Sequence, residues 1–166
     1  MGWKLTAPAK RIFCASATTH ARPVADTLVF DMNAILRKEC VYGPDVSPAA
    51  AVTIFWQRHV RPSSATTFYF AFDNPAKIPQ ERIDFHATIR YRDATPTAGP
   101  IVIAHKPLGM PWAAAWKTTS KKDMWTVIAA ALYDKVMTAA REGVTYIVDP
   151  PAGDIRTQPE GVVIDA

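Results

Sequence analysis

Thr27-Leu28-Val29-Phe30-Asp31 decides the fold of this chain, together with a similar run at Thr67-Phe68-Tyr69-Phe70-Ala71-Phe72-Asp73. Each run is short, rich in β-branched and aromatic residues, and closed by an aspartate, which is typical of a buried strand. Helical patterning between the runs predicts two neighbouring parallel strands of an α/β sheet. Because the carboxyl ends of parallel strands meet at one edge, we expect Asp31 and Asp73 where such sheets bind ligands.

A helix is predicted between these strands. Ser47 precedes Pro48, a pairing that suits a capping residue followed by the first helical position. Apolar residues then recur at helical spacing through His59, at Val52, Phe55, Trp56 and Val60. The sequence therefore predicts a helix of about three turns and a right-handed β-α-β unit.

The second half of the chain predicts a longer helix and a third strand. Ser120 and Asp123 resemble a capping box, and an apolar stripe follows that ends near Gly143, with members Met124, Ile128, Leu132, Val136 and Ala140. Residues 144–148 then form a strand pattern that leads to Asp149. A short or bent helix over 79–92 and a strand over 101–104 complete the expected elements.

These elements predict a three-layer α/β/α domain with a mainly parallel central sheet. A length of 166 residues with 49% hydrophobic residues suits one compact domain. We assign residues 27–166 to this domain, with its C-terminal end incomplete as an alternative. Residues 1–26 form a basic N-terminal arm, which contains Lys4, Lys10, Arg11 and Arg22 and no acid before Asp26.

Composition favours a soluble intracellular protein. No apolar run approaches the roughly 20 residues that span a bilayer. Cys14 and Cys40 form no CxxC pair, so neither a disulfide framework nor a zinc site is indicated. The basic arm also has the composition of an organellar transit peptide, which leaves mitochondrial targeting as an alternative. The net charge of +4 is compatible with a polyanionic partner.

Acidic residues followed by basic ones indicate chemistry on nucleic acid. Two carboxylates at one sheet edge suit a divalent cation, and the basic residues after Asp73 suit phosphate, with members Lys77, Arg82, Arg90 and Arg92. The plainer alternatives are that each aspartate caps a helix or forms a turn, and that the arginines pair with Glu81, Asp84 and Asp93. Trp112 and Trp116 lie beside lysines, so they stack on bases or pack a loop onto the core.

Two blocks resemble a known family. Leu28-Val29-Phe30-Asp31-Met32-Asn33-Ala34-Ile35-Leu36 is similar to the opening D-M-N-G-I-I strand of Xrn-type 5′→3′ exoribonucleases, members of the PIN-like, flap-endonuclease superfamily. Phe70-Ala71-Phe72-Asp73, followed by Pro75-Ala76-Lys77-Ile78-Pro79-Gln80-Glu81-Arg82, resembles that family's D-G-x-A-P-x-A-K-x-x-Q-x-R segment. The resemblance covers roughly residues 27–92.

The resemblance implies a nuclease dependent on Mg²⁺ or Mn²⁺ that acts on RNA or DNA. It makes Asp31 and Asp73 catalytic metal ligands, and Lys77, Gln80 and Arg82 contacts to the terminal phosphate. Two metals about 4 Å apart need several carboxylates. We therefore expect Asp149 or Asp154 to supply a third ligand, with Glu160 or Asp165 as candidates for a fourth.

Departures from the family pattern support alternative functions. Asn74 replaces the glycine after the second aspartate, and the P-G-E-x-E motif has only the counterpart Pro150-Pro151-Ala152-Gly153-Asp154. One alternative is a catalytically inactive nucleic-acid-binding or assembly subunit, with protein partners or a missing C-terminal part. Another is a haloacid-dehalogenase-like phosphohydrolase, although that family has a second aspartate where Asn33 stands.

Overall fold

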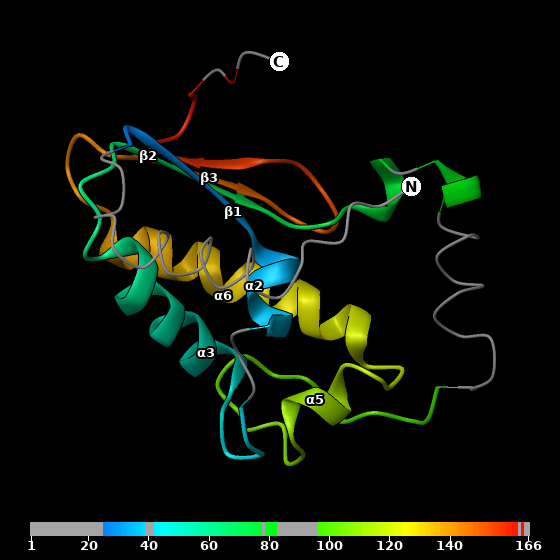
Figure 1. Ribbon diagram of the computed structural model, residues 1–166. Coiled ribbons are helices and arrows are strands. Elements are labelled where there is room, and N and C mark those ends of the chain that lie inside the picture. Colours follow the sequence, from blue (N-terminus) through cyan, green and yellow to red (C-terminus); the bar gives the residue numbers. More distant parts are fainter. Residues whose placement is uncertain (1–24, 39–41, 78, 83–95, 163, 165–166) are drawn as a thin grey trace, which may run out of the picture.

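The protein is an α/β structure built on one four-stranded sheet (Figure 1). The computed structural model describes residues 25–38, 42–77, 79–82, 96–162 and 164. The strands follow the order β1-β2-β3-β4, with bounds β1 Thr27–Asp31, β2 Thr67–Ala71, β3 Thr145–Asp149 and β4 Arg156–Gln158. β1, β2 and β3 are parallel, whereas β4 is antiparallel to β3. The α/β class is therefore confirmed, and the sheet is mixed.

Helices connect and cover these strands. The sequence pattern for the first connection is confirmed, because the Ser47 hydroxyl accepts from the Ala50 N–H (3.2 Å) and Pro48 opens the helix. The helix bounds are α2 Met32–Lys38, α3 Pro48–Phe55, α5 Trp112–Ala115 and α6 Lys121–Ala139. A π-helical segment, η1 Trp56–Val60, continues α3, and a 3₁₀ turn, η2 Pro75–Lys77, follows β2.

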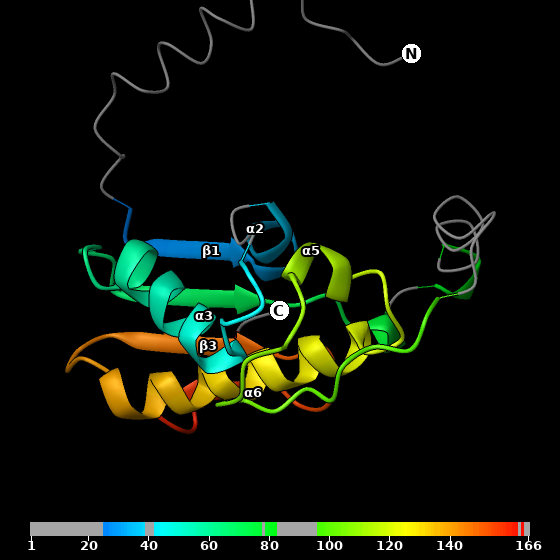
Figure 2. The same ribbon diagram turned by 90° about the horizontal axis from the view of Figure 1, so that it is seen from below.

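The two connecting helices lie on the same face of the sheet. Figures 1 and 2 show α3 and α6 side by side against that face, in two perpendicular views. The strand order explains this arrangement, because right-handed crossovers that step in one direction place every helix on one side. Within the described ranges we see no helix over the opposite face, so the three-layer arrangement stays a prediction.

The core lies between the sheet and these helices. Phe68, Phe70 and Tyr146 are fully buried on the strands, and Ile128 and Leu132 of α6 are equally buried. The aromatic rings stack across the strands, with centroids 5.5 Å apart for Phe68 and Tyr146. On the opposite face the exposure is higher, since Val29 is 68% exposed. The alternation of the strands thus defines one packed face and one open face.

Local patterns were wrong at several elements. Ser120 does not cap α6 with its side chain, which donates to the carbonyl of Pro100 instead. Residues 101–104 form no strand. β4 was not predicted at all. Most of the helix expected over 79–92, and nearly all of the N-terminal arm, lie outside the described residues. No described helix combines the length and apolar character needed to cross a membrane.

Candidate metal and phosphate site

The strand register brings two of the predicted acids to one edge. Asp31 ends β1 and Asp149 ends β3, and both are paired in register with Ala71 of β2. Residues in register on neighbouring strands point to the same face. With strands about 4.8 Å apart, the Cα atoms of the two aspartates are about 10 Å apart. Ala71 lies between them on β2.

Asp31 also has a structural role. Its Oδ1 accepts a hydrogen bond from the backbone N–H of Ala34 (3.0 Å) in the first turn of α2. The helix-capping alternative considered for this residue is therefore confirmed. A cap of this kind uses one carboxylate oxygen and does not prevent the other from binding a cation.

Asn33 links the two family-like blocks. Its side-chain oxygen accepts a hydrogen bond from the backbone N–H of Asp73 (3.0 Å). Directly before Asp73, the N–H of Phe72 donates to the carbonyl of Asp149 (3.0 Å). Asp73 itself is exposed. The segment that carries Asp73 is thus fastened to both of the strand ends that carry the other acids.

Among the three acids, Asp149 has the most side-chain contacts in the described structure. Its Oδ2 accepts from the Tyr69 hydroxyl (3.0 Å), and its Oδ1 lies 3.3 Å from the Lys77 Nζ. Burial raises the pKa of Tyr69 above its ordinary value of 10.0, and the hydrogen bond and negative charge of Asp149 raise it further. Tyr69 was missed in the sequence, although it lies two residues before Ala71 on the same face of β2. The phenol therefore stays a donor to Asp149 at neutral pH.

The predicted phosphate contacts lie on the segment after β2. Lys77 closes η2 and contacts Asp149 rather than standing apart from the acids. Gln80 and Arg82 follow on an exposed stretch, and Arg82 donates its N–H to the carbonyl of Pro79 (3.0 Å). Arg90 lies outside the described residues. Of the described residues predicted to bind phosphate, Lys77 is thus the one that lies beside an acid at the strand ends.

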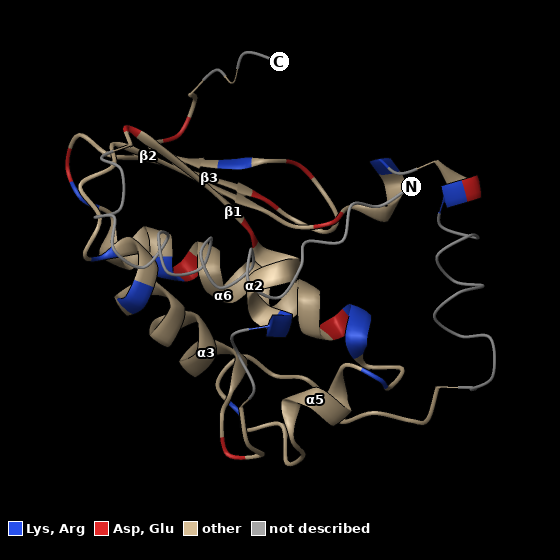
Figure 3. Cartoon of the chain, in the orientation of Figure 1, with Lys and Arg blue, Asp and Glu red and all other residues tan. Residues whose placement is uncertain are grey.

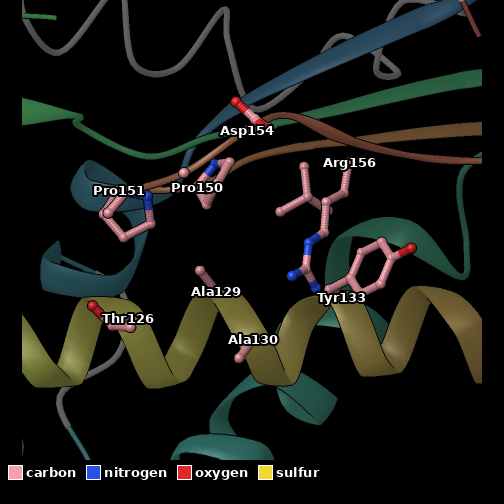
Figure 4. A pocket seen from close by; sticks show the side chains of 11 residues that line it. Thr126, Ala129, Ala130, Tyr133, Pro150, Pro151, Asp154 and Arg156 are labelled. Carbon is pink, nitrogen blue, oxygen red and sulfur yellow. The ribbon is translucent and has the colours of Figure 1, made fainter. Parts of the chain in front are cut away.

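Asp154 lies in the turn between β3 and β4, at the rim of a cavity of about 180 Å³. Figure 4 shows its carboxylate pointing away from α6, whereas the Arg156 guanidinium points towards Tyr133. Arg156 lies 4.8 Å from the centroid of the Tyr133 ring, a cation–π distance. The cavity walls are otherwise mainly apolar, from Ala129, Ala130, Pro150 and Pro151.

The described oxygen ligands at this edge are of the kind that a hard cation prefers, but they are not spaced closely enough to share one. Mg²⁺ and Mn²⁺ prefer carboxylate and carbonyl oxygens, which Asp31, Asp73, Asp149 and Asn33 supply at one edge. Across the part of the chain that the structure describes, no three acids, histidines or cysteines are grouped closely enough for a shared cation.

The tryptophans that follow residue 110 pack the core side of this edge. Trp112 is fully buried and donates its Nε1–H to the carbonyl of Val46 (3.0 Å). Trp116 stacks on Trp125 with centroids 4.2 Å apart. The packing alternative is therefore the one that the structure supports for both residues.

No family model, curated protein or solved structure matches this chain.

Proposed function

We propose that this chain is a divalent-metal-dependent nuclease of the PIN-like type, which hydrolyses phosphodiester bonds of RNA or DNA near a 5′ end. One observation carries the proposal. Asp31 and Asp149 flank Ala71 in register on one face of the sheet, and Lys77 reaches the same edge. This reaction needs carboxylates that bind a metal ion and a positively charged side chain that binds phosphate.

Each group has a distinct part in the proposed reaction. A bound Mg²⁺ or Mn²⁺ would supply an activated water and stabilise the leaving oxygen. Asp31, Asp73 and Asp149 would balance its charge, with Asp154 as a further candidate ligand. Lys77, Gln80, Arg82 and Arg90 would position the phosphate. Asn33 would hold the Asp73 backbone at a fixed distance from β1. A PIN-like three-layer arrangement belongs to the same proposal.

The charge distribution supports this function. Figure 3 shows acidic positions at the strand ends and basic positions at the end of α2, with basic and acidic positions side by side at the beginning of α6 and in the segment after β2. Basic side chains near the acids, such as Lys77, favour an anionic substrate and raise its local concentration.

A second candidate function is nucleic-acid binding without cleavage. The observation that favours it is the contact of Lys77 with Asp149, because an ammonium group there neutralises a carboxylate that the cation would use. In that case the fold and the basic side chains would persist while the metal site stays incomplete.

Cleavage assays separate the two functions. Labelled 5′-phosphorylated RNA and DNA, single-stranded and with a flap, would be incubated with the protein in Mg²⁺ or Mn²⁺. We expect Asp73→Asn to reduce cleavage by more than about 100-fold. That loss exceeds the effect of removing a residue that only hydrogen-bonds to a metal ligand. The matched control is Asp134→Asn, because Asp134 is exposed on α6. Salt-dependent binding without cleavage by the unaltered protein would exclude the nuclease and favour the second function.

A further inference from the structure

We infer that a second basic surface, Arg37, Lys38, Lys117, Lys121 and Lys122, binds the backbone of the nucleic acid beyond the strand-end acids. The inference rests on the proposed function and extends it to the path of the substrate. We call these five residues the corner surface. Arg37 and Lys38 end α2, Lys121 and Lys122 begin α6, Lys117 precedes α6, and Arg37 lies over Trp125 of α6.

Trp125 brings the corner surface together from segments that are distant in sequence. The Arg37 guanidinium lies over its ring, 5.8 Å from the centroid. Trp116, which directly precedes Lys117, stacks on the same residue. Lys121 and Lys122 lie one turn before Trp125 on α6. The packed rings of Trp116 and Trp125 thus position the backbone segments that carry Arg37, Lys117 and Lys121.

The corner surface begins close to the candidate metal site. Phe72 contacts Trp125 edge to face, with centroids 6.3 Å apart, and Asp73 is the next residue. The rings of Phe72 and Trp125 thus connect the residue before Asp73 to the Arg37 guanidinium. We therefore expect a strand whose terminal phosphate is held at Lys77 and Arg82 to reach the corner surface with its following phosphates.

Three lysines of the corner surface are directed to solvent. Lys38, Lys117 and Lys122 are exposed, and no described acidic side chain lies within ion-pair distance of them. Asp123 is the acid in the first turn of α6. The positive end of the α6 dipole adds to the same field, which the carboxylate of Asp123 in the first turn partly offsets. Such a surface favours a polyanion.

The test compares two triple variants. Lys38→Gln, Lys117→Gln and Lys122→Gln together remove exposed charge from the corner surface. Arg58→Gln, Arg61→Gln and Lys135→Gln remove equal charge from η1, the residue after it and the later part of α6. Both variants keep the full chain, and circular dichroism would verify that each is folded. Binding would be followed by fluorescence anisotropy over a range of salt, with EDTA present so that cleavage does not interfere.

We expect the corner variant to bind a long 5′-phosphorylated single strand at least 10-fold more weakly at low salt. The slope of log affinity against log salt should fall by about 0.7 for each phosphate that the variant no longer neutralises. Binding of a 5′-phosphorylated dinucleotide should not change, because it ends before the corner surface. The control variant should lose clearly less affinity than the corner variant.

Equal losses in both variants, or an unchanged salt slope, would overturn the inference. So would loss of binding to polyglutamate with RNA affinity unchanged, since the surface would then suit an acidic protein. Failure of the nuclease proposal is recognised separately. It appears as absence of Mg²⁺- or Mn²⁺-dependent cleavage by the unaltered chain, whatever the salt slopes show.

Discussion

At the scale of single residues, Lys77 is the one with two competing partners. Its ammonium group lies 3.3 Å from Asp149, yet the proposed reaction needs it on phosphate. The pair is open to solvent, with the Lys77 side chain 57% exposed. Such pairs contribute at most about 1 kcal/mol, so phosphate binding can separate them at small cost.

Removal of the Lys77 charge should therefore strengthen metal binding. We expect Lys77→Met to raise Mn²⁺ affinity up to about 5-fold in the absence of nucleic acid, because Asp149 loses a competing cation. Isothermal titration calorimetry measures this, with Lys135→Met as the matched control. A lowered affinity in the Lys77 variant would mean that the lysine does not compete with the metal.

Tyr69 provides a pH-dependent test of the same contact. The raised pKa means that the unfolded chain loses the phenolic proton before the folded chain does. The stability contributed by this group is therefore complete below the ordinary tyrosine pKa and decreases as the pH rises above about 10. We expect Tyr69→Phe to lose less stability than the unaltered chain between about pH 9 and pH 11 in urea unfolding. Parallel losses in the two proteins would contradict the assignment.

The two roles of Asp31 can be separated by a pair of variants. Asparagine caps helices about as well as aspartate does, whereas alanine does not. We expect Asp31→Ala to lower the free energy of unfolding by about 1 kcal/mol and Asp31→Asn to leave it nearly unchanged. Urea unfolding measures both. If both variants lose cleavage while the asparagine variant keeps full stability, the role of Asp31 in activity is distinct from its role as a cap.

At the scale of elements, strong periodicity was predictive, whereas the capping motifs were confirmed at Ser47 and wrong at Ser120. β1, β2, β3, α3 and α6 were all expected within a few residues of their bounds, because their apolar patterns match the faces that they bury. The run at 101–104 has strand-like composition, but Ile101 is 86% exposed and the segment joins no sheet. Ser120 matches a helix cap in the local sequence, but its hydroxyl donates to the carbonyl of Pro100, twenty residues earlier. Such outcomes depend on tertiary neighbours, which local patterns do not contain.

A substitution at Gly99 tests how residues 97–104 pack against the residues that precede α6. The N–H of Thr119 donates to the carbonyl of Thr97 (3.0 Å), and a Cβ at Gly99 would collide with the side chains of Thr118 and Ser120. We expect Gly99→Ala to destabilise the protein by about 1–3 kcal/mol, as overpacking does. Gly43→Ala is the control, because a Cβ there meets nothing within 4 Å. Equal unfolding midpoints for the two variants would show that the segment is not tightly packed.

At the scale of the whole molecule, topology explains what the sequence predicts of the site. Parallel strands must end at one edge, so the neighbourhood of Asp31 and Asp149 was predictable from strand patterns. The strand order was not, and it decides that Ala71 lies between the two acids. The contacts of Asp149 with Tyr69 and Lys77 depend on register across strands, which a single sequence does not specify.

The central claim of the proposal is that Asp31, Asp73 and Asp149 bind one metal ion, although the described residues do not group them closely enough to share it. Mn²⁺ binding to the full chain, followed by electron paramagnetic resonance, tests it most directly, with a 5′-phosphorylated dinucleotide present to engage Lys77. We expect Asp31→Asn, Asp73→Asn and Asp149→Asn each to weaken Mn²⁺ binding by at least about 10-fold, whereas Asp134→Asn should not. Unchanged Mn²⁺ affinity in the three strand-end variants would contradict the account.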